Sequence, residues 1–172
     1  MRKGYIQVYT GEGKGKTTAA LGLALRAAGA GLRVFIAQFI KTKICSEHKA
    51  LERFGDLVTV KQFGTGFIKG RRRTESEVSA AQKGFAEVTR LLASGEYDIV
   101  ILDEINVAMR TGLVSIECVL KLLDERPPQV EIVLTGRHAD KRIIRRADLV
   151  TEMKEIKHYM NKGVNARKGI EM

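Results

Sequence analysis

Short apolar segments recur along the chain and alternate with longer segments of mixed polarity. Most of the short segments are β-branched or continuously apolar, which is typical of strands that are covered on both faces of a sheet. The pattern predicts strands at Tyr5–Tyr9, Arg33–Phe39, Val58–Gln62, Ile99–Leu102, Ile132–Thr135 and Leu149–Glu152.

The longer segments carry apolar residues at helical spacing. Between Glu75 and Ala93 apolar side chains recur every three or four residues, which defines one buried face of a helix. Ser115 precedes another such segment and is a suitable N-cap. The predicted helices are Lys16–Ala28, Glu47–Phe54, Glu75–Ala93, Ile116–Asp124 and Lys141–Ala147.

This alternation of strands and helices predicts an α/β fold with a mostly parallel sheet flanked by helices. No linker or internal repeat divides the chain, so residues 1–172 are expected to form a single domain. Ligands of such sheets bind at the carboxyl ends of the strands. We therefore expect functional residues directly after each predicted strand.

The composition indicates a globular protein with a strong attraction for anions. Of the 172 residues, 44% are hydrophobic and 29% are charged, and the formal net charge is +10. Such a field attracts nucleotides, nucleic acids or acidic membrane surfaces without choosing among them. The apolar runs are far too short for a membrane span, and no secretory hydrophobic segment follows the N-terminus.

Cys45 and Cys118 form no CxxC pair and have no histidine partner pattern, so we expect two reduced thiols and a cytoplasmic protein. The densest basic run is Arg71–Arg73, which is either a solvated cluster or a contact for an anionic ligand. No aromatic residues interleave with this run, which weakens the case for a single-strand nucleic-acid site.

The most informative segment is Thr10–Ala19, with the sequence TGEGKGKTTA between the first strand and the first helix. Glycines in this context let backbone N–H groups approach a phosphate at the positive end of the helix. Lys16 would reach a terminal phosphate, and the Thr17 hydroxyl is a candidate Mg²⁺ ligand. Two features depart from the usual loop: Thr10 stands in the first glycine position, and Lys14 adds a second cation.

The fourth predicted strand is followed directly by Asp103 and Glu104, a pattern that indicates a second nucleotide motif. An acid there holds Mg²⁺ directly or through water, and we assign this role to Asp103. Glu104 has three interpretations: it polarises a water molecule, contacts the metal, or binds a second substrate.

Other strand ends carry further candidates. Arg137 follows the fifth strand and is a natural contact for a phosphate group, or else a surface residue in a tight turn. Phe67 follows two glycines and lies either at the mouth of the site or in the core. We interpret His48 and His138 as ordinary loop residues, because neither has an evident metal partner.

Taken together, these motifs resemble those of the P-loop ATP:corrinoid adenosyltransferases, which act in cobalamin biosynthesis and salvage. The resemblance spans nearly the whole chain and implies a P-loop NTPase-like fold with a RecA-like arrangement. The matching segments are Thr10–Thr18, Gln38–Lys41, Thr65–Phe67, Leu102–Glu104, Thr135–Arg137, Ile156–His158 and Gly163–Glu171.

The resemblance implies that a Co(I) corrinoid attacks C5′ of ATP and displaces triphosphate. Catalysis would then depend on neutralising the leaving group with Mg²⁺ and with cations such as Lys14 and Lys16. The implied catalytic residues are Lys16, Lys14 and Glu104; the implied metal ligands are Thr17, Asp103 and Glu104; and Phe67, Glu104 and Arg137 would contact the corrinoid. The implied nucleotide-binding residues are Thr10, Gly11, Glu12, Gly13, Lys14, Gly15, Lys16, Thr17, Thr18 and Arg137.

The resemblance also implies a reductase partner such as a flavoprotein, a homodimer, and a C-terminal tail, residues 155–172, that folds over the site. The chain departs from the family at Lys69, where a tryptophan is frequent, and it lacks the N-terminal extension of some members. We expect these departures to alter corrinoid binding rather than the reaction.

Two other functions remain open at this point. A RecA-like ATPase acting on nucleic acid would use the same loop and the Asp103–Glu104 pair, and the positive charge would suit it. A nucleotide sensor would bind ATP without turnover. We do not expect nucleic acid or a membrane as partners.

Overall fold

The computed structural model describes residues 3–66 and 73–171. Its centre is one six-stranded sheet in the order β3-β2-β4-β5-β1-β6, and every neighbouring pair is parallel. The predicted parallel sheet is therefore confirmed. The strands are β1 (Ile6–Thr10), β2 (Val34–Gln38), β3 (Val58–Gln62), β4 (Ile99–Asp103), β5 (Glu131–Thr135) and β6 (Leu149–Glu152).

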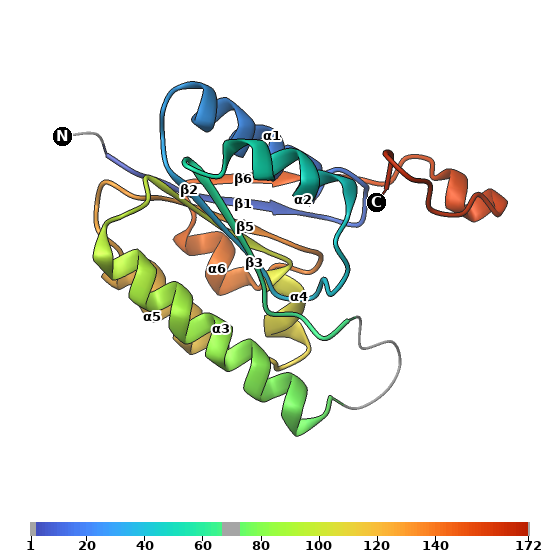
Figure 1. Cartoon of the computed structure of the whole chain (residues 1–172). Helices are drawn as coiled ribbons and strands as arrows, with labels where there is room; N and C mark the ends of the chain where they lie inside the picture. The colour runs from blue at the N-terminus through green and yellow to red at the C-terminus, as the bar shows by residue number, and fades with distance from the viewer. Residues whose placement is uncertain (1–2, 67–72, 172) are drawn as a thin grey trace.

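Helices cover both faces of this sheet (Figure 1). One face packs against the alanine-rich side of α1 and against α2, and the other packs against α3, α4, α5 and α6. The central strands β2 and β4 are buried at every position, which explains why they are apolar up to their last residues, Gln38 and Asp103. The helices are α1 (Lys16–Gly29), α2 (Ser46–Leu51), α3 (Glu75–Ser94), α4 (Ile105–Arg110), α5 (Ile116–Glu125) and α6 (Lys141–Arg146).

The ends of the helices follow local chemistry. Thr74 caps α3 by accepting from the Glu77 N–H, and the predicted cap at Ser115 accepts from the Cys118 N–H at 3.1 Å. Caps of this kind are worth about 1 kcal/mol each. Within α3, Ala81, Val88 and Leu92 are buried as the periodicity predicts.

Three short elements differ from the sequence-based prediction. The helix predicted over Glu47–Phe54 is instead α2 followed by a 3₁₀ turn, η1 (Glu52–Phe54). Helix α4 follows Glu104 directly and was not predicted, because six residues are too few to show a helical period. A second 3₁₀ turn, η2 (Tyr159–Lys162), lies in the tail.

The strand order determines the site. Because β5 lies between β1 and β4, the Thr10–Ala19 loop and the Asp103–Glu104 pair are separated by one strand at the same edge of the sheet. Gln38 is the register partner of Asp103 on the other side of β4. Among the described residues, no helix has the length and apolarity that crossing a membrane requires, and Cys45 and Cys118 are free thiols, as predicted.

Candidate functional site

The loop between β1 and α1 is held by backbone contacts that only glycine permits. Gly11 has φ of 97°, and a Cβ there would lie 2.4 Å from the Met153 carbonyl oxygen. A Cβ on Gly13 would lie 2.8 Å from the same oxygen, to which the Gly13 N–H donates at 2.7 Å. The glycines thus allow the chain that follows β6 to pack directly against the loop.

Lys16 is the first residue of α1, and its side chain reaches the centre of the loop. Its ammonium donates to the carbonyl oxygens of Gly11 and Gly13, both at 2.7 Å, and only 7% of the residue is exposed. Burial lowers the pKa of this lysine, and the nearby Glu104 carboxylate partly opposes the effect. A buried cation at the start of a helix creates a strongly anion-attracting position.

The unusual threonine at the start of the loop has a structural role. Thr10 is buried, and its hydroxyl accepts a hydrogen bond from the Ala139 N–H at 3.2 Å. Glycine at this position would leave that N–H without the hydroxyl as a partner. Thr10 therefore links the loop to the segment between β5 and α6.

Asp103 is the acceptor at the centre of a buried network. Its Oδ1 accepts from the Thr17 hydroxyl at 2.9 Å and from the Thr135 hydroxyl at 2.7 Å, and its Oδ2 accepts from Gln38 Nε2 at 3.1 Å. Asp103 is 1% exposed. Buried carboxylates need such partners, because an unpaired charge in the interior is very costly. The network joins β2, β4, β5 and the first turn of α1.

Glu104 occupies an uncommon backbone conformation beside this network. It has φ of 61°, a left-handed value that is rare for residues other than glycine, and its N–H donates to the Thr135 hydroxyl at 2.9 Å. Burial raises the pKa of the Glu104 carboxyl, and the charge of Asp103 raises it further. Such strain and such shifts cluster at functional sites.

Arg137 reaches the loop from the end of β5. Its guanidinium pairs with the Glu12 carboxylate at 2.9 Å, and both side chains are about half exposed. His138 Nδ1 lies 3.4 Å from the other oxygen of Glu12. An exposed pair of this kind contributes at most about 1 kcal/mol to stability. Arg137 can therefore exchange Glu12 for another anion at low cost.

Lys14 binds the C-terminal tail. Its ammonium lies 2.7 Å from a Glu171 carboxylate oxygen and donates to the Tyr159 hydroxyl at 2.9 Å. Arg167 also contacts Glu171, at 3.3 Å, and stacks over the Tyr159 ring. Hydrogen bonds from Lys14, Tyr159 and Arg167 hold the pKa of Glu171 well below its usual range. The hydrogen bond with Glu171 is also the main cause of the raised pKa of Lys14.

The structure brings the predicted site residues at the loop, at Asp103–Glu104 and at Arg137 to one edge of the sheet. The predicted corrinoid contact Phe67 and the family departure Lys69 lie outside the described residues, as do Arg71 and Arg72. Arg73 donates to the Thr111 carbonyl oxygen at 3.0 Å, so this member of the basic run supports the connection between α4 and α5.

Sequence reasoning missed several polar residues that contact the site. Gln38 and Thr135 both bind Asp103. Both lie in segments that resemble the family, but neither was assigned a role in the site from the sequence. Asn106 is 1% exposed and donates to the Gly136 carbonyl oxygen at 3.3 Å. No sequence signal indicated Asn106, because α4 itself was not predicted.

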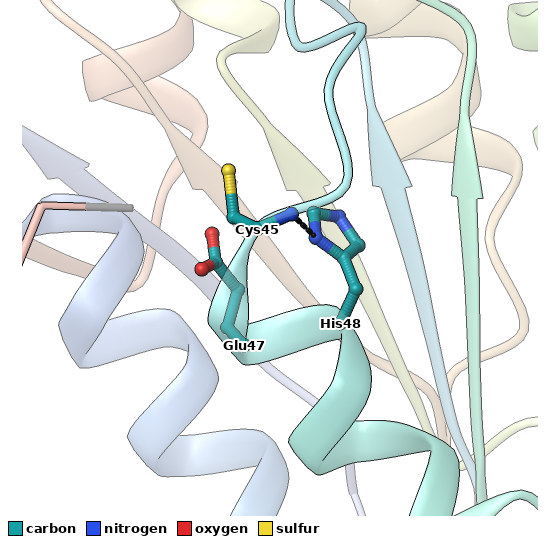
Figure 2. A group of neighbouring side chains, drawn as sticks. All are labelled: Cys45, Glu47 and His48. Atoms are coloured by element: carbon teal, nitrogen blue, oxygen red, sulfur yellow. Dashed lines mark hydrogen bonds between the residues drawn. The ribbon is translucent and has the colours of Figure 1, made fainter. Parts of the chain in front are cut away.

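His48 was interpreted as a loop residue but is buried on α2, 9% exposed. Cys45, Glu47 and His48 bring possible metal-ligand atoms within 4.8 Å of one another (Figure 2). However, His48 Nδ1 accepts from the Cys45 N–H at 2.8 Å, and His48 Nε2 lies 2.7 Å from Gln38 Oε1. Both imidazole nitrogens are therefore engaged within the protein.

The other members of this cluster are engaged as well. The Glu47 carboxylate pairs with the Lys41 ammonium at 2.6 Å. Burial opposes the charged form of each group. The contact outweighs this effect, so the pKa of Glu47 is lowered and that of Lys41 is raised. In Figure 2 the imidazole of His48 lies on the far side of the Cys45 backbone from the thiol and the carboxylate. We therefore do not assign a metal to this cluster.

Comparison with solved structures finds the same fold in two other proteins. The flagellar accessory protein FlaH from Methanocaldococcus jannaschii superimposes with a TM-score of 0.61 at 13% identity, over 88% of this chain and 72% of that one. The KaiC-like protein PH0186 from Pyrococcus horikoshii gives 0.55 at 14% identity, over 90% and 74%. These likenesses concern the fold alone, which is P-loop NTPase-like as expected.

Sequence comparison is more specific. The family model for ATP:corrinoid adenosyltransferase BtuR/CobO/CobP matches residues 2–172. The corrinoid adenosyltransferase of Escherichia coli (strain K12) is 39% identical over 170 residues, covering 98% of this chain and 86% of that protein. The corrinoid adenosyltransferase of Pseudomonas aeruginosa is 35% identical over 170 residues, covering 98% and 84%. On these matches and on the geometry of its loop and acidic pair, the chain belongs to the ATP:corrinoid adenosyltransferase family.

Proposed function

We propose that this adenosyltransferase binds MgATP on the β1–α1 loop and transfers the 5′-deoxyadenosyl group to a Co(I) corrinoid, with triphosphate as the other product. The electron pair of Co(I) forms the Co–C5′ bond, and the electron pair of the broken C5′–O bond leaves on triphosphate. No general base is needed, because no proton is removed. The observation that carries the proposal is Lys16 buried at the loop centre, next to the hydrogen bond between Thr17 and Asp103.

The residues around Asp103 fit magnesium. Mg²⁺ prefers hard oxygen ligands, and this corner offers the Thr17 hydroxyl and the carboxylates of Asp103 and Glu104. Because Thr17 donates its proton to Asp103, its oxygen lone pairs remain free for a cation. Both oxygens of Asp103 already accept hydrogen bonds, which favours a role for Asp103 through Thr17 or water. Bound Mg²⁺ would supply Lewis-acid neutralisation of the triphosphate.

The cations at the loop would stabilise the leaving group. Negative charge builds on triphosphate as the C5′–O bond breaks, and cations already in place stabilise it without reorganisation. We assign this role to Lys16 and Lys14, with Arg137 and the loop backbone as further phosphate contacts. Thr10, Gly11, Glu12, Gly13, Gly15, Thr17 and Thr18 complete the proposed nucleotide site.

For the corrinoid we retain Phe67, Glu104 and Arg137 as proposed contacts. Arg137 is supported by its exposure beside the loop, and Glu104 by its burial at the same edge of the sheet. The contacts of Lys14 support a tail, residues 155–172, that folds against the nucleotide site. Forming Co(I) from Co(II) takes one electron, so we also propose a reductase partner such as a flavoprotein. A homodimer and a cytoplasmic location complete the proposal.

An assay of products tests this function. Protein, MgATP and a chemically reduced corrinoid should yield the light-sensitive spectrum of an alkylcobalamin together with triphosphate. An ATPase acting on nucleic acid, which the family matches do not favour, would instead release ADP and phosphate on addition of DNA or RNA. ATP binding without the alkylcobalamin spectrum would overturn the proposal.

The second loop lysine provides a sharper test. We expect Lys14→Ala to lower kcat by about tenfold to a hundredfold, because a hydrogen bond to a charged group is worth about 1.5–3 kcal/mol. The matched control is Glu171→Ala, which removes the acceptor of the tail contact but keeps the lysine, and its kcat should stay within about twofold of the wild type. Equal losses in both variants would assign the effect to the tail instead of to the leaving group.

The tail contact should survive mild acid. The pKa of Glu171 is depressed in the folded protein, so the contact is fully present above the ordinary pKa of a glutamate and is lost only as the pH falls through the depressed value. Amide NMR shifts of residues 159–171 should therefore change little between pH 8 and about pH 4.5. Glu171→Ala should show the shifts of the released tail throughout this range. A wild-type transition centred at the ordinary glutamate pKa would contradict the prediction.

A further inference from the structure

Three buried side chains from separate elements connect α2 to the acidic centre of the site. His48 Nε2 lies 2.7 Å from Gln38 Oε1, and Gln38 Nε2 lies 3.1 Å from Asp103 Oδ2. The three residues are 9%, 1% and 1% exposed, respectively. We infer that His48 is a positioning residue, which fixes the Gln38 amide so that its NH₂ group faces Asp103. This inference rests on the proposed role of Asp103 in binding MgATP.

The groups at the two ends of this series of hydrogen bonds determine which atom carries the proton in each bond. A backbone N–H can only donate, so the Cys45 N–H at 2.8 Å makes His48 Nδ1 an acceptor. The neutral ring then carries its proton on Nε2, which donates to Gln38 Oε1. With its oxygen held by His48, the Gln38 amide presents its NH₂ group to the carboxylate. The donors thus run in one direction from Cys45 to Asp103, which polarises each bond in turn.

The orientation of Gln38 matters because a terminal amide can rotate by half a turn. In the reversed orientation its oxygen would face the Asp103 carboxylate, and two acceptors would repel each other. Gln62 Nε2 also donates to Gln38 Oε1, but at 3.2 Å, so His48 provides the shorter bond. The bond from Gln38 keeps Oδ2 occupied, and Oδ1 remains the acceptor for Thr17.

The imidazole ring of His48 also makes a purely structural contact, and the test must separate this contact from the effect of His48 on Gln38. Through Nδ1, His48 completes the capping box of α2 with Cys45 (Figure 2). Glutamine places an amide nitrogen where the ring has Nε2, whereas asparagine places an amide oxygen where the ring has Nδ1. His48→Gln therefore keeps the donor to Gln38, and His48→Asn keeps the cap.

The experiment titrates ATP binding with Mg²⁺ in both variants by calorimetry. We expect His48→Asn to raise the Mg²⁺ concentration at half-saturation by about fivefold, since one ordinary hydrogen bond is lost from the network. His48→Gln should stay within about twofold of the wild type. The effect of His48→Asn should also disappear in a Gln38→Ala background, because His48 acts on Asp103 only through Gln38.

Two results would overturn the inference: equal losses in His48→Gln and His48→Asn, or a His48→Asn effect that persists without Gln38. If the ATP affinity of the wild-type protein did not depend on Mg²⁺, the proposed role of Asp103 in binding MgATP would be overturned instead. The imidazole ¹⁵N shifts of His48 then show which ring nitrogen carries the proton. A proton on Nε2 supports the inferred arrangement, and a proton on Nδ1 contradicts it.

Discussion

Replacing Lys16 with alanine should lower kcat/KM for ATP by at least about a hundredfold to a thousandfold. This is the loss typical of removing one preorganised group that stabilises charge in a transition state. Lys16 is the buried cation of the loop, and its ammonium lies within 2.7 Å of two loop carbonyl oxygens. Those carbonyls hold the ammonium at the loop centre, where triphosphate would bind. Initial rates of alkylcobalamin formation over a range of ATP concentrations measure the effect.

The control for this variant is Lys121→Ala, which removes the same charge from an exposed pair with Glu125 on α5. Its kcat/KM should stay within about twofold of the wild type, since exposed pairs of this kind are weak. Thermal unfolding of both variants checks that each is folded. A folded Lys16→Ala protein with wild-type kinetics would refute the proposed nucleotide site.

The second large effect is expected at Asp103. Asp103→Asn should lower kcat/KM by about a hundredfold and raise the Mg²⁺ concentration needed for half-maximal rate. The carboxylate accepts from the hydroxyls of Thr17 and Thr135 and from the amide of Gln38. Asparagine removes the charge and turns one acceptor into a donor, so at least one of these partners faces another donor. Hydrogen bonds to charged groups are worth about 1.5–3 kcal/mol each, which makes the loss substantial.

Asp98→Asn is the matched control, because Asp98 lies directly before β4, at the opposite end of the strand from Asp103. Its Oδ2 accepts from the Arg33 N–H at 2.8 Å, away from the loop. The same loss of charge there should leave the Mg²⁺ requirement unchanged. If Asp103→Asn kept the wild-type kcat/KM and Mg²⁺ requirement, Asp103 would have no part in binding the nucleotide.

Local patterns predicted most of the fold. All six strands appear where the apolar runs placed them, with ends that differ by at most one residue. The long helices followed from their periodicity, as α3 shows with Ala81 and Val88 in the core. The elements that the sequence did not predict correctly are short. Helix α4 has six residues, and the helix predicted from Glu47 to Phe54 is divided into α2 and η1. Elements shorter than two turns do not repeat often enough to reveal a period.

The nucleotide motifs were readable because their chemistry is contiguous. Lys16 and Thr17 directly follow the glycine-rich loop, and Asp103 ends its strand, so spacing alone predicted phosphate and metal binding. Family motifs then extended this reading to corrinoid adenosyl transfer, and the family matches confirmed the membership. The interpretation of His48 as a loop residue was wrong, since a solitary histidine gives no sign of which distant side chain it contacts.

The sequence by itself determined the order of the elements, the parallel sheet, the glycine-rich loop between β1 and α1, and the family. These features depend on residues that are neighbours along the chain. Only the tertiary structure decided which side chains surround Asp103, because the parallel register sets Gln38 beside it from a strand 65 residues away. The same holds for Lys14 and Glu171, which are 157 residues apart and meet through the path of the tail. Contacts over such separations depend on strand order and packing, which no local pattern of polarity records.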